Sequence, residues 1–317
     1  AILLEAGVPP GVVQLLPGRG ETVGAQLTGD DRVRGVMFTG STEVATLLQR
    51  NIASRLDAQG RPIPLIAETG GMNAMIVDSS ALTEQVVIDV LASAFDSAGQ
   101  RCSALRVLCL QDEIADHTLK MLRGAMAECR MGNPGRLTTD IGPVIDGEAK
   151  TNIERHIQTM RSKGRPVFQA VRENSEDARE WQSGTFVAPT LIELDDFAEL
   201  QKEVFGPVLH VVRYNRNQLP ALIEQINASG YGLTLGVHTR IDETIAQVTG
   251  SAHVGNLYVN RNMVGAVVGV QPFGGEGLSG TGPKAGGPLY LYRLLANRPE
   301  SALAVTLARQ DAEYPVD

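Results

Sequence analysis

The chain has few cysteines and histidines for its length. Of its 317 residues, three are cysteines and five are histidines. The cysteines have no paired spacing typical of a metal site, and their odd number leaves one unpaired in any disulfide scheme. The histidines do not cluster as metal ligands do; they are His117, His156, His210, His238 and His253. We therefore expect no metal site and a reducing, cytoplasmic setting.

Long apolar runs and long basic runs are also absent. No stretch of about 18 uncharged apolar residues occurs, which argues against a membrane-spanning helix. The formal net charge of −8, without a basic run, argues against nucleic-acid binding, because phosphate neutralisation needs clustered lysine and arginine. Residues 1–7 lack a basic leader and a cleavage site, and they read as the last turns of a helix that ends at Gly7. A small-molecule substrate remains the expected partner.

What is present indicates an α/β protein with a largely parallel sheet. Hydrophobic residues make up 43% of the chain, enough for a large core in one or two domains. Short apolar runs alternate with helical patterns, which is typical of this architecture. Strands are predicted at residues 12–16, 35–38, 64–67, 106–110, 207–212, 234–238 and 255–259, and helices at 113–129, 147–161 and 218–228. A second α/β unit is predicted to begin near Gly71. The high glycine density of residues 265–287 predicts irregular backbone in close approach to something.

Cys102 is a candidate nucleophile. Apolar residues recur on one face of residues 87–95, which predicts a helix ended by Gly99 with Cys102 just beyond it. A cysteine in that position, with Arg101 beside it to favour the thiolate, could attack an electrophile. The alternative is a buried structural cysteine. The other two cysteines have no such context and are interpreted as core or helix residues.

Three further features are weighed in the same way. Glu68 follows the apolar run 65–67 and precedes two glycines, so it should lie at a strand end and could act as a general base, or it could be a solvated carboxylate. Gly40 and Ser41 follow a predicted strand and open a helix, where backbone N–H groups could hold a pyrophosphate; a plain strand-to-helix turn is the alternative. Gly18 begins only a weak match to a dinucleotide loop, because the third glycine is displaced.

Four motifs together carry a family resemblance. They are Phe38-Thr39-Gly40-Ser41-Thr42, Glu68-Thr69-Gly70-Gly71, Phe95-Asp96-Ser97-Ala98-Gly99-Gln100-Arg101-Cys102-Ser103 and Glu203-Val204-Phe205-Gly206-Pro207, followed by Pro272-Phe273-Gly274-Gly275. Their order and spacing resemble the aldehyde dehydrogenase superfamily. The resemblance implies that Cys102 forms a thiohemiacetal and then a thioester, that Glu68 is the general base, and that NAD is the cofactor. The residues it implies for NAD binding are Gly18, Gly40, Ser41, Thr69, Gly70, Glu203 and Phe205.

A narrower resemblance concerns the substrate. Residues 260–288 resemble those of L-glutamate γ-semialdehyde dehydrogenase, and the whole chain resembles the aldehyde dehydrogenase part of bacterial bifunctional proline-utilization enzymes. In that group, backbone amides matching Gly265 and Ala266 anchor the substrate carboxylate together with the hydroxyl of Ser103. Phe273 would pack on the aliphatic part of the substrate, and Arg101 would add its field. The implied reaction oxidises glutamate semialdehyde, formed from pyrroline-5-carboxylate, to glutamate. Another aldehyde remains an alternative.

The resemblance also implies a domain arrangement. Residues 1–70 would be part of an NAD-binding domain, residues 71–272 a catalytic domain, and residues 273–317 a C-terminal segment whose strand, near 302–307, could pair with another subunit. The oxyanion-hole asparagine and the ribose-binding lysine of complete members have no counterpart here, so the chain resembles a C-terminal fragment with little activity alone. FAD would belong to an absent proline-oxidising domain. A catalytically silent assembly fragment is the alternative.

Overall fold

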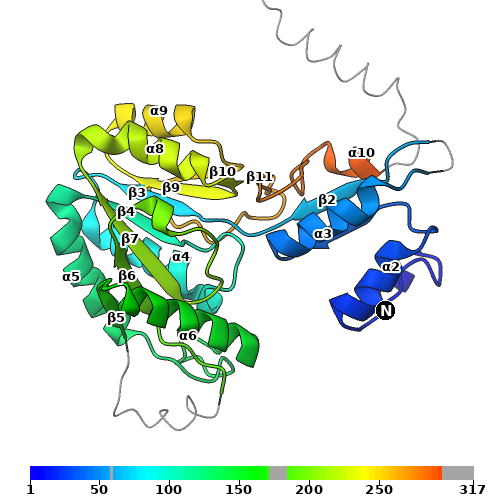
Figure 1. The fold of residues 1–317 in the computed structure, drawn as a ribbon, viewed down its shortest axis with the longest axis horizontal. Coiled ribbons are helices and arrows are strands. Elements are labelled where there is room, and N and C mark those ends of the chain that lie inside the picture. Colours follow the sequence, from blue (N-terminus) through cyan, green and yellow to red (C-terminus); the bar gives the residue numbers. More distant parts are fainter. Residues whose placement is uncertain (58–59, 171–183, 295–317) are drawn as a thin grey trace, which may run out of the picture.

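The molecule consists of two α/β units joined by a glycine-rich segment, as Figure 1 shows. The computed structural model describes residues 1–57, 60–170 and 184–294. The larger unit is built on a seven-stranded sheet and the smaller one on two parallel strands. This arrangement confirms the predicted α/β architecture with a mainly parallel sheet.

The large sheet has the strand order β10-β9-β3-β4-β7-β6-β5. Its strands are β3 Ala74–Val77, β4 Val107–Gln111, β5 Val167–Gln169, β6 Thr190–Leu194, β7 Val208–Tyr214, β9 Thr234–His238 and β10 Asn256–Val259. Neighbouring strands are parallel except for the antiparallel pair of β5 and β6. Strands β3 and β4 are buried along their whole length, as expected of central strands covered on both faces. Strands β3, β5 and β6 were not predicted from the sequence.

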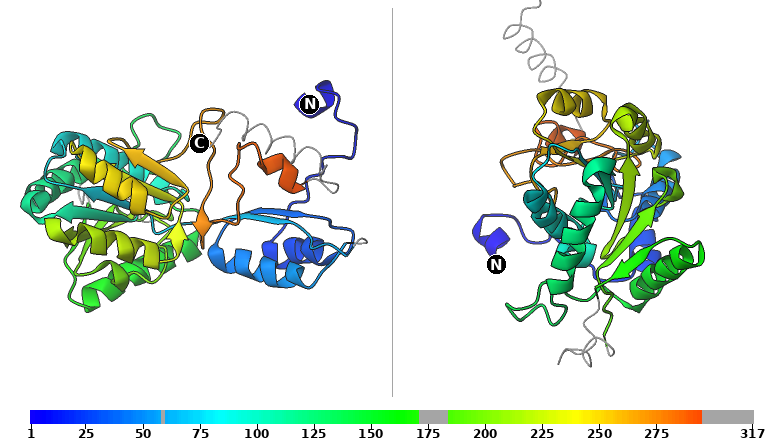
Figure 2. Two further views of the ribbon diagram at one scale, coloured as in Figure 1. Left: turned by 90° about the horizontal axis from the view of Figure 1, so that it is seen from above. Right: turned by 90° about the vertical axis from the view of Figure 1, so that its left-hand side faces the viewer.

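Helices cover both faces of the large sheet. They are α4 Thr83–Phe95, α5 Asp112–Glu128, α6 Gly147–Ser162, α8 Leu219–Ala228 and α9 Asp242–Ser251, with 3₁₀ turns at Asp96–Gly99, Phe197–Glu199 and Arg216–Gln218. Figure 2 shows α5 on one side of the sheet and α6 and α8 on the other. The helices predicted at 113–129, 147–161 and 218–228 differ from α5, α6 and α8 by at most one residue at each end, and the helix predicted around residues 87–95 is α4.

The smaller unit has little buried core. It contains α1 Ile2–Glu5, a π-helical turn at Gly20–Gly24, α2 Ala25–Gly29, β1 Val36–Thr39, α3 Thr42–Ala53 and β2 Leu65–Glu68, with β1 and β2 paired in parallel. Its hydrophobic cluster contains four buried residues, Ile52, Ile63, Leu65 and Ala67. Ile66 of β2 is also buried. The strand predicted at residues 12–16 was wrong. This segment is an exposed loop, bounded by Pro9-Pro10 and Pro17, and no strand of the described chain pairs with it.

The glycine-rich segment ties the two units together. Its strand β11 Glu276–Gly277 pairs with β8 Tyr231–Gly232 of the large unit. The residues that follow bond to the edge of β2: the Thr69 N–H donates to the Ser279 carbonyl at 3.0 Å, and the Thr281 N–H donates to the Ala67 carbonyl at 2.9 Å. A Cβ on Gly275 would lie 2.5 Å from the Cβ of Ser279, so the predicted close backbone approach is confirmed.

Several predictions fall beyond what the structure describes. The expected strand at 302–307 lies outside the described residues, and the last described helix is α10 Tyr290–Leu294. The domain limits at residues 70 and 272 stay predictions. Within the described chain, no helix has the length and apolar character needed to cross a membrane, and no group of three or more metal-ligating side chains occurs.

Candidate active site

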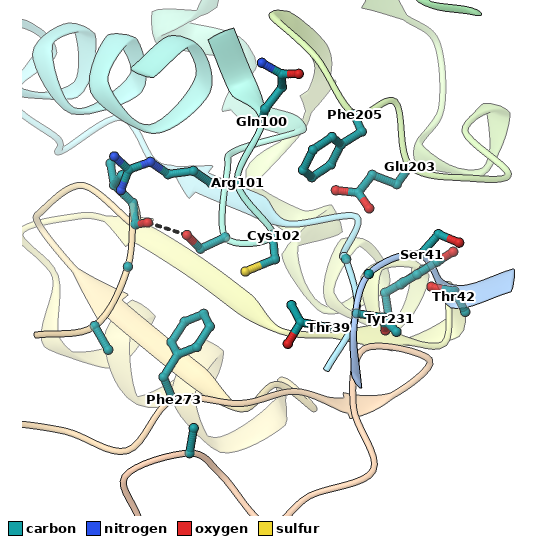
Figure 3. Close-up of a pocket in the computed structure, with 18 of the residues that line it drawn as sticks. Thr39, Ser41, Thr42, Gln100, Arg101, Cys102, Glu203, Phe205, Tyr231 and Phe273 are labelled. Carbon is teal, nitrogen blue, oxygen red and sulfur yellow. Dashed lines mark hydrogen bonds between the residues drawn. The ribbon is translucent and has the colours of Figure 1, made fainter. Parts of the chain in front are cut away.

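A pocket of about 950 Å³ lies where the two units meet. It brings together most of the predicted site residues, namely Gly40, Ser41, Thr69, Gly70, Arg101, Cys102, Ser103, Glu203, Phe205, Gly265, Ala266 and Phe273. Figure 3 shows the sulfur of Cys102 directed into this space, with Glu203 and Phe205 on another wall. Gly18 and Glu68 are not among the lining residues. Gly18 lies in an exposed loop, so its predicted cofactor contact has no support in the pocket.

The Cys102 loop begins with an unusual turn. After α4 ends at Phe95, three consecutive residues adopt left-handed backbone angles: Ser97 with φ 55°, Ala98 with φ 54° and Gly99 with φ 66°. A left-handed conformation is unfavourable for residues other than glycine, so tertiary contacts must hold this turn. A Cβ on Gly99 would lie 2.2 Å from the carbonyl oxygen of Gly206, which leaves room for glycine alone.

Two buried polar residues hold the loop that follows. The Asn73 side-chain amide donates to the carbonyls of Cys102 at 2.7 Å and Ala104 at 2.9 Å. Arg106 donates to the carbonyls of Gly99 and Arg101. Neither residue was identified from sequence. The available signal was a polar residue placed directly before each apolar strand run, since Asn73 precedes β3 and Arg106 precedes β4.

The electrostatic setting of Cys102 corrects one expectation. Burial raises the pKa of the Cys102 thiol, while the Ser103 backbone and the positive charge of Arg106 lower it and Glu203 raises it. The cation that favours the thiolate is therefore Arg106 rather than Arg101, whose Nε donates to Ser97 Oγ at 3.1 Å. A raised pKa favours the protonated thiol, so attack by Cys102 needs a base.

The other two cysteines match their predicted roles as core or helix residues. Cys109 is fully buried in β4, and burial raises its pKa to about 12. Cys129 follows α5 and is half-buried against the large core. Cys129 Sγ donates to the Ala125 carbonyl at 3.6 Å.

Glu203 is anchored in the pocket wall by Arg106. Its Oε1 accepts from the Arg106 Nε at 3.1 Å and Nη2 at 2.8 Å. Burial raises the pKa of Glu203, and the Arg106 charge opposes that rise. The ring of Phe205 lies 5.1 Å from the Arg106 guanidinium carbon. A Cβ on Gly70 would lie 1.7 Å from Glu203 Oε2, so the strand end after β2 approaches Glu203 as only glycine can.

Glu68 lies at the end of β2, as predicted, but its carboxylate faces the glycine-rich segment. Its Oε2 accepts from the Gly275 N–H at 3.1 Å, and its Oε1 is buried without a hydrogen-bond partner. Burial raises the pKa of Glu68, opposed by the Gly275 amide and by the charge of Lys284. A buried carboxylate oxygen without a partner is costly, so this orientation is weakly held.

The predicted substrate loop borders the pocket near the nucleophile. Ser103 is buried, and its hydroxyl donates to the Val264 carbonyl, directly before Gly265. A Cβ on Gly265 would lie 3.9 Å from Ser103 Oγ, so the loop passes close to this hydroxyl. Phe273 is held by paired backbone bonds with Ala285, at 3.0 and 2.8 Å.

On the smaller unit, the turn between β1 and α3 faces the same pocket. Ser41 is the N-cap of α3, and its hydroxyl accepts from the Val44 N–H at 3.3 Å. The ring of Phe38 fills the space beside Gly40, where a Cβ would lie 2.4 Å from its Cζ. The N-terminus of a twelve-residue helix is thus directed at the pocket, which suits an anionic group.

Comparisons with known proteins identify the family. The sequence signature of the aldehyde dehydrogenase family matches residues 1–296. This chain belongs to the aldehyde dehydrogenase family. It is 98% identical over all 317 residues to the bifunctional protein PutA of Escherichia coli K12, of which it covers 24%. It is 36% identical over 292 residues to the 1-pyrroline-5-carboxylate dehydrogenase of Geobacillus kaustophilus, covering 92% of this chain and 55% of that one.

A solved structure is similar over the same range. The 1-pyrroline-5-carboxylate dehydrogenase from Thermus, solved with bound NAD, matches with a TM-score of 0.82 and 37% identity, covering 92% of this chain and 55% of that one. The predicted family and its relation to pyrroline-5-carboxylate dehydrogenases are confirmed. The chain spans about a quarter of the E. coli protein and about half of the two dehydrogenases.

Proposed function

We propose that this chain carries the aldehyde-oxidising site of an NAD-dependent enzyme that converts L-glutamate γ-semialdehyde, formed from pyrroline-5-carboxylate, to L-glutamate in proline catabolism. The observation that carries the proposal is the placement of Cys102, Glu203 and the Gly40–Ser41 turn on the walls of one pocket. Family membership and the names of the relatives support the reaction and the substrate.

The residues of the pocket fit NAD. The N-terminus of α3, at Gly40 and Ser41, would hold the pyrophosphate, because free N–H groups and the helix dipole favour an anion there. Glu203 would accept from the ribose hydroxyls, and Phe205, 45% exposed, offers an apolar face for the nicotinamide. Thr69 and Gly70 border the same wall, with no side chain at Gly70 to obstruct it. When bound, NAD supplies the hydride acceptor.

The chain's own residues would perform the remaining chemistry. Cys102 Sγ gives up its proton and attacks the aldehyde carbon to form a thiohemiacetal, and the Cys102 backbone N–H donates to the developing oxyanion. After oxidation, the thioester is cleaved by water that has lost a proton to Glu68. To reach either proton, the Glu68 carboxylate must turn away from the Gly275 amide. The raised pKa of Glu68 suits a base that accepts protons nearer neutral pH.

The carboxylate of the substrate would be held beside the nucleophile. Backbone amides of Gly265 and Ala266 are the proposed donors, with Ser103 once its hydroxyl turns from the Val264 carbonyl. Phe273 would pack on the aliphatic part, and Arg101 would contribute positive charge at the pocket wall. Several fixed donors favour a substrate with a carboxylate at the correct distance from the aldehyde.

A substrate comparison tests the proposal. The E. coli protein and this chain are assayed with NAD and either pyrroline-5-carboxylate or an aldehyde of the same length without the carboxylate. Leaving buried donors unpaired costs roughly 1–3 kcal/mol per group, so the second aldehyde should be oxidised far less efficiently. Equal kcat/KM for the two would overturn the substrate assignment.

The alternative of a catalytically silent assembly fragment is tested on the thiols. In a formed site, iodoacetamide should alkylate Cys102 much faster than Cys109 and Cys129, as mass spectrometry of the peptides would show. Equal alkylation of the three would favour the silent fragment.

A further inference from the structure

Arg106 is the largest fully buried side chain among the described residues, with 1% of its surface exposed. Its guanidinium reaches two separate segments of the site. Toward the nucleophile loop, it donates to the carbonyls of Gly99 at 2.7 Å and Arg101 at 3.0 Å. Toward the cofactor side, it donates to the Glu203 carboxylate at 2.8 and 3.1 Å and to the Gly206 carbonyl at 3.4 Å.

These contacts use all the hydrogens of the guanidinium. Nε donates to Glu203, Nη1 donates to the carbonyls of Gly99 and Gly206, and Nη2 donates to Arg101 and Glu203. A buried cation is costly unless its donors are satisfied, so this arrangement compensates for the loss of water. Lysine has only three donors on one atom and cannot reproduce the fork.

The loop that Arg106 holds is strained. The left-handed conformation costs roughly 1–2 kcal/mol for each residue other than glycine, and both Ser97 and Ala98 adopt it. Such a turn persists only where the surroundings hold it. Arg106 bonds to the carbonyls of Gly99 and Arg101, which lie between the strained pair and Cys102.

The backbone of Arg106 is itself held by His210 of β7. Its carbonyl oxygen lies 2.9 Å from the backbone nitrogen of His210 and 3.1 Å from that residue's ring Nδ1. Since a carbonyl only accepts, Nδ1 carries the proton and Nε2 accepts from His156 Nε2, 2.9 Å away. Both ends of Arg106 are therefore held within the large unit.

We propose that Arg106 is a positioning residue that couples the Cys102 loop to the segment Glu203–Gly206, so that one side chain sets the distance between the nucleophile and the cofactor wall. This rests on the proposed function in one respect, namely that Glu203 contacts NAD. The coupling itself rests on the five hydrogen bonds alone.

The kinetic test uses Arg106→Met and Arg106→Lys at the matching position of the E. coli protein. The methionine variant should lower kcat about 100-fold, because small misplacement of a reacting group is that costly. It should also raise the KM for NAD roughly tenfold, which corresponds to losing one charge-assisted hydrogen bond. In the lysine variant the KM for NAD should return most of the way to the wild-type value, because an ammonium can pair with Glu203. Its kcat should stay low, because lysine cannot hold both loop carbonyls.

Arg165→Met is the matched control, because Arg165 pairs with Glu199 at 2.9 Å and does not line the pocket. Its kcat and KM should stay at the wild-type values. A merely structural role for Arg106 would reduce the amount of folded protein without separating kcat from KM. Near-normal kcat in the lysine variant would overturn the coupling.

Hydrogen exchange on this 317-residue chain without NAD separates the two proposals. In Arg106→Met, amides of residues 97–102 and 203–206 should both exchange faster than in wild type and in Arg165→Met. Unchanged exchange in either segment would overturn the positioning role. If the methionine variant does not fold, the same exchange measurement is made on the lysine variant. Wild-type E. coli protein that fails to oxidise pyrroline-5-carboxylate with NAD would instead overturn the proposed function, leaving exchange to decide the role of Arg106.

Discussion

The two units differ in how firmly they hold their share of the site. In the large unit, β3 and β4 are buried throughout, and the loops in front of them are fixed by Asn73 and Arg106. In the small unit, β1 alternates between half-buried and exposed residues, and the hydrophobic cluster contains four buried residues. The nucleophile is therefore preorganised, whereas the proposed cofactor-binding turn lies on a weakly packed unit. NAD binding to the folded state should stabilise the small unit most.

The two carboxylates of the site show the same contrast. Glu203 is fixed by an ion pair with the buried Arg106, in which two guanidinium nitrogens donate to its carboxylate. The Glu68 carboxylate accepts one hydrogen bond, from the Gly275 N–H, and its other oxygen has no hydrogen-bond partner. This difference fits their proposed roles, because a group that positions a cofactor should be rigid, whereas a base that serves two steps must move.

The largest effect is expected at the rigid half of the site. Cys102→Ala in the E. coli protein should abolish aldehyde oxidation, because no other group of the pocket can form the thioester. NAD affinity, measured by calorimetry, should survive, since the cofactor wall is untouched. Cys129→Ala is the control and should retain activity, because Cys129 lies after α5 and outside the pocket. Near-normal turnover without Cys102 would remove the nucleophile assignment.

The next effect is expected at the movable carboxylate. Glu68→Gln should slow turnover by roughly 10²–10⁴-fold, the usual contribution of a general base. Deacylation should slow more than acylation, so stopped-flow absorbance should show a rapid burst of NADH and then a slow phase. The ionised fraction of Glu68, which is the form that acts as a base, increases as pH rises through its pKa. Because burial raises this pKa above the ordinary value of 4.5, the rise in wild-type turnover should be centred above pH 4.5. If turnover of the glutamine variant rose with pH in the same way as that of the wild type, another group would be responsible for the pH dependence.

The sequence predicted elements in both units, and it missed or misplaced strands in both. Strands β7, β9 and β10 and helices α5, α6 and α8 were predicted within two residues. Helices buried on one face show a periodic pattern, and buried strands show short apolar runs. The segment 12–16 has the composition of a strand, yet a strand forms only where a neighbour pairs with it. Cys102 was identified from its motif, but Arg106 was not, because its role depends on carbonyls distant in sequence, such as that of Gly206.

A pair of truncations in the two sheets would sharpen the packing contrast. Leu108→Ala, in the fully buried strand β4, should cost about 2–5 kcal/mol of unfolding free energy, through lost burial and a cavity. Met37→Ala in β1, where the side chain is 55% exposed, should stay within about 0.5 kcal/mol of wild type. Urea unfolding of this chain measures both. Equal losses would show that the small unit is packed as tightly as the large one.

The smallest effect concerns the titration of histidines, and it should act on the large unit alone, because residues 1–70 contain no histidine. Burial lowers the pKa of His210 to about 3 and that of His156 to about 4, below the ordinary 6.5. Below pH 6.5 the unfolded chain therefore binds protons that the folded chain excludes. The contribution of these neutral histidines to the free energy of unfolding is fully present above pH 6.5. It falls with acidification, by about 1.4 kcal/mol per pH unit for His210. The contribution of His156 should be smaller, because part of its ring faces solvent.

Urea unfolding between pH 7 and 5 would measure this slope in wild type and in His210→Gln, where it should flatten. His117→Gln, which changes an exposed histidine on α5, is the control and should keep the wild-type slope. Hydrogen exchange at pH 5 should show the loss in β4 and β7, the strands beside the histidine pair, before it appears in β1 and β2. An unchanged slope in His210→Gln would mean that the pair takes up its protons without unfolding. The hydrogen bond from His210 to the Arg106 carbonyl would then tolerate protonation of Nε2, and the two sheets would not differ in their response to acid.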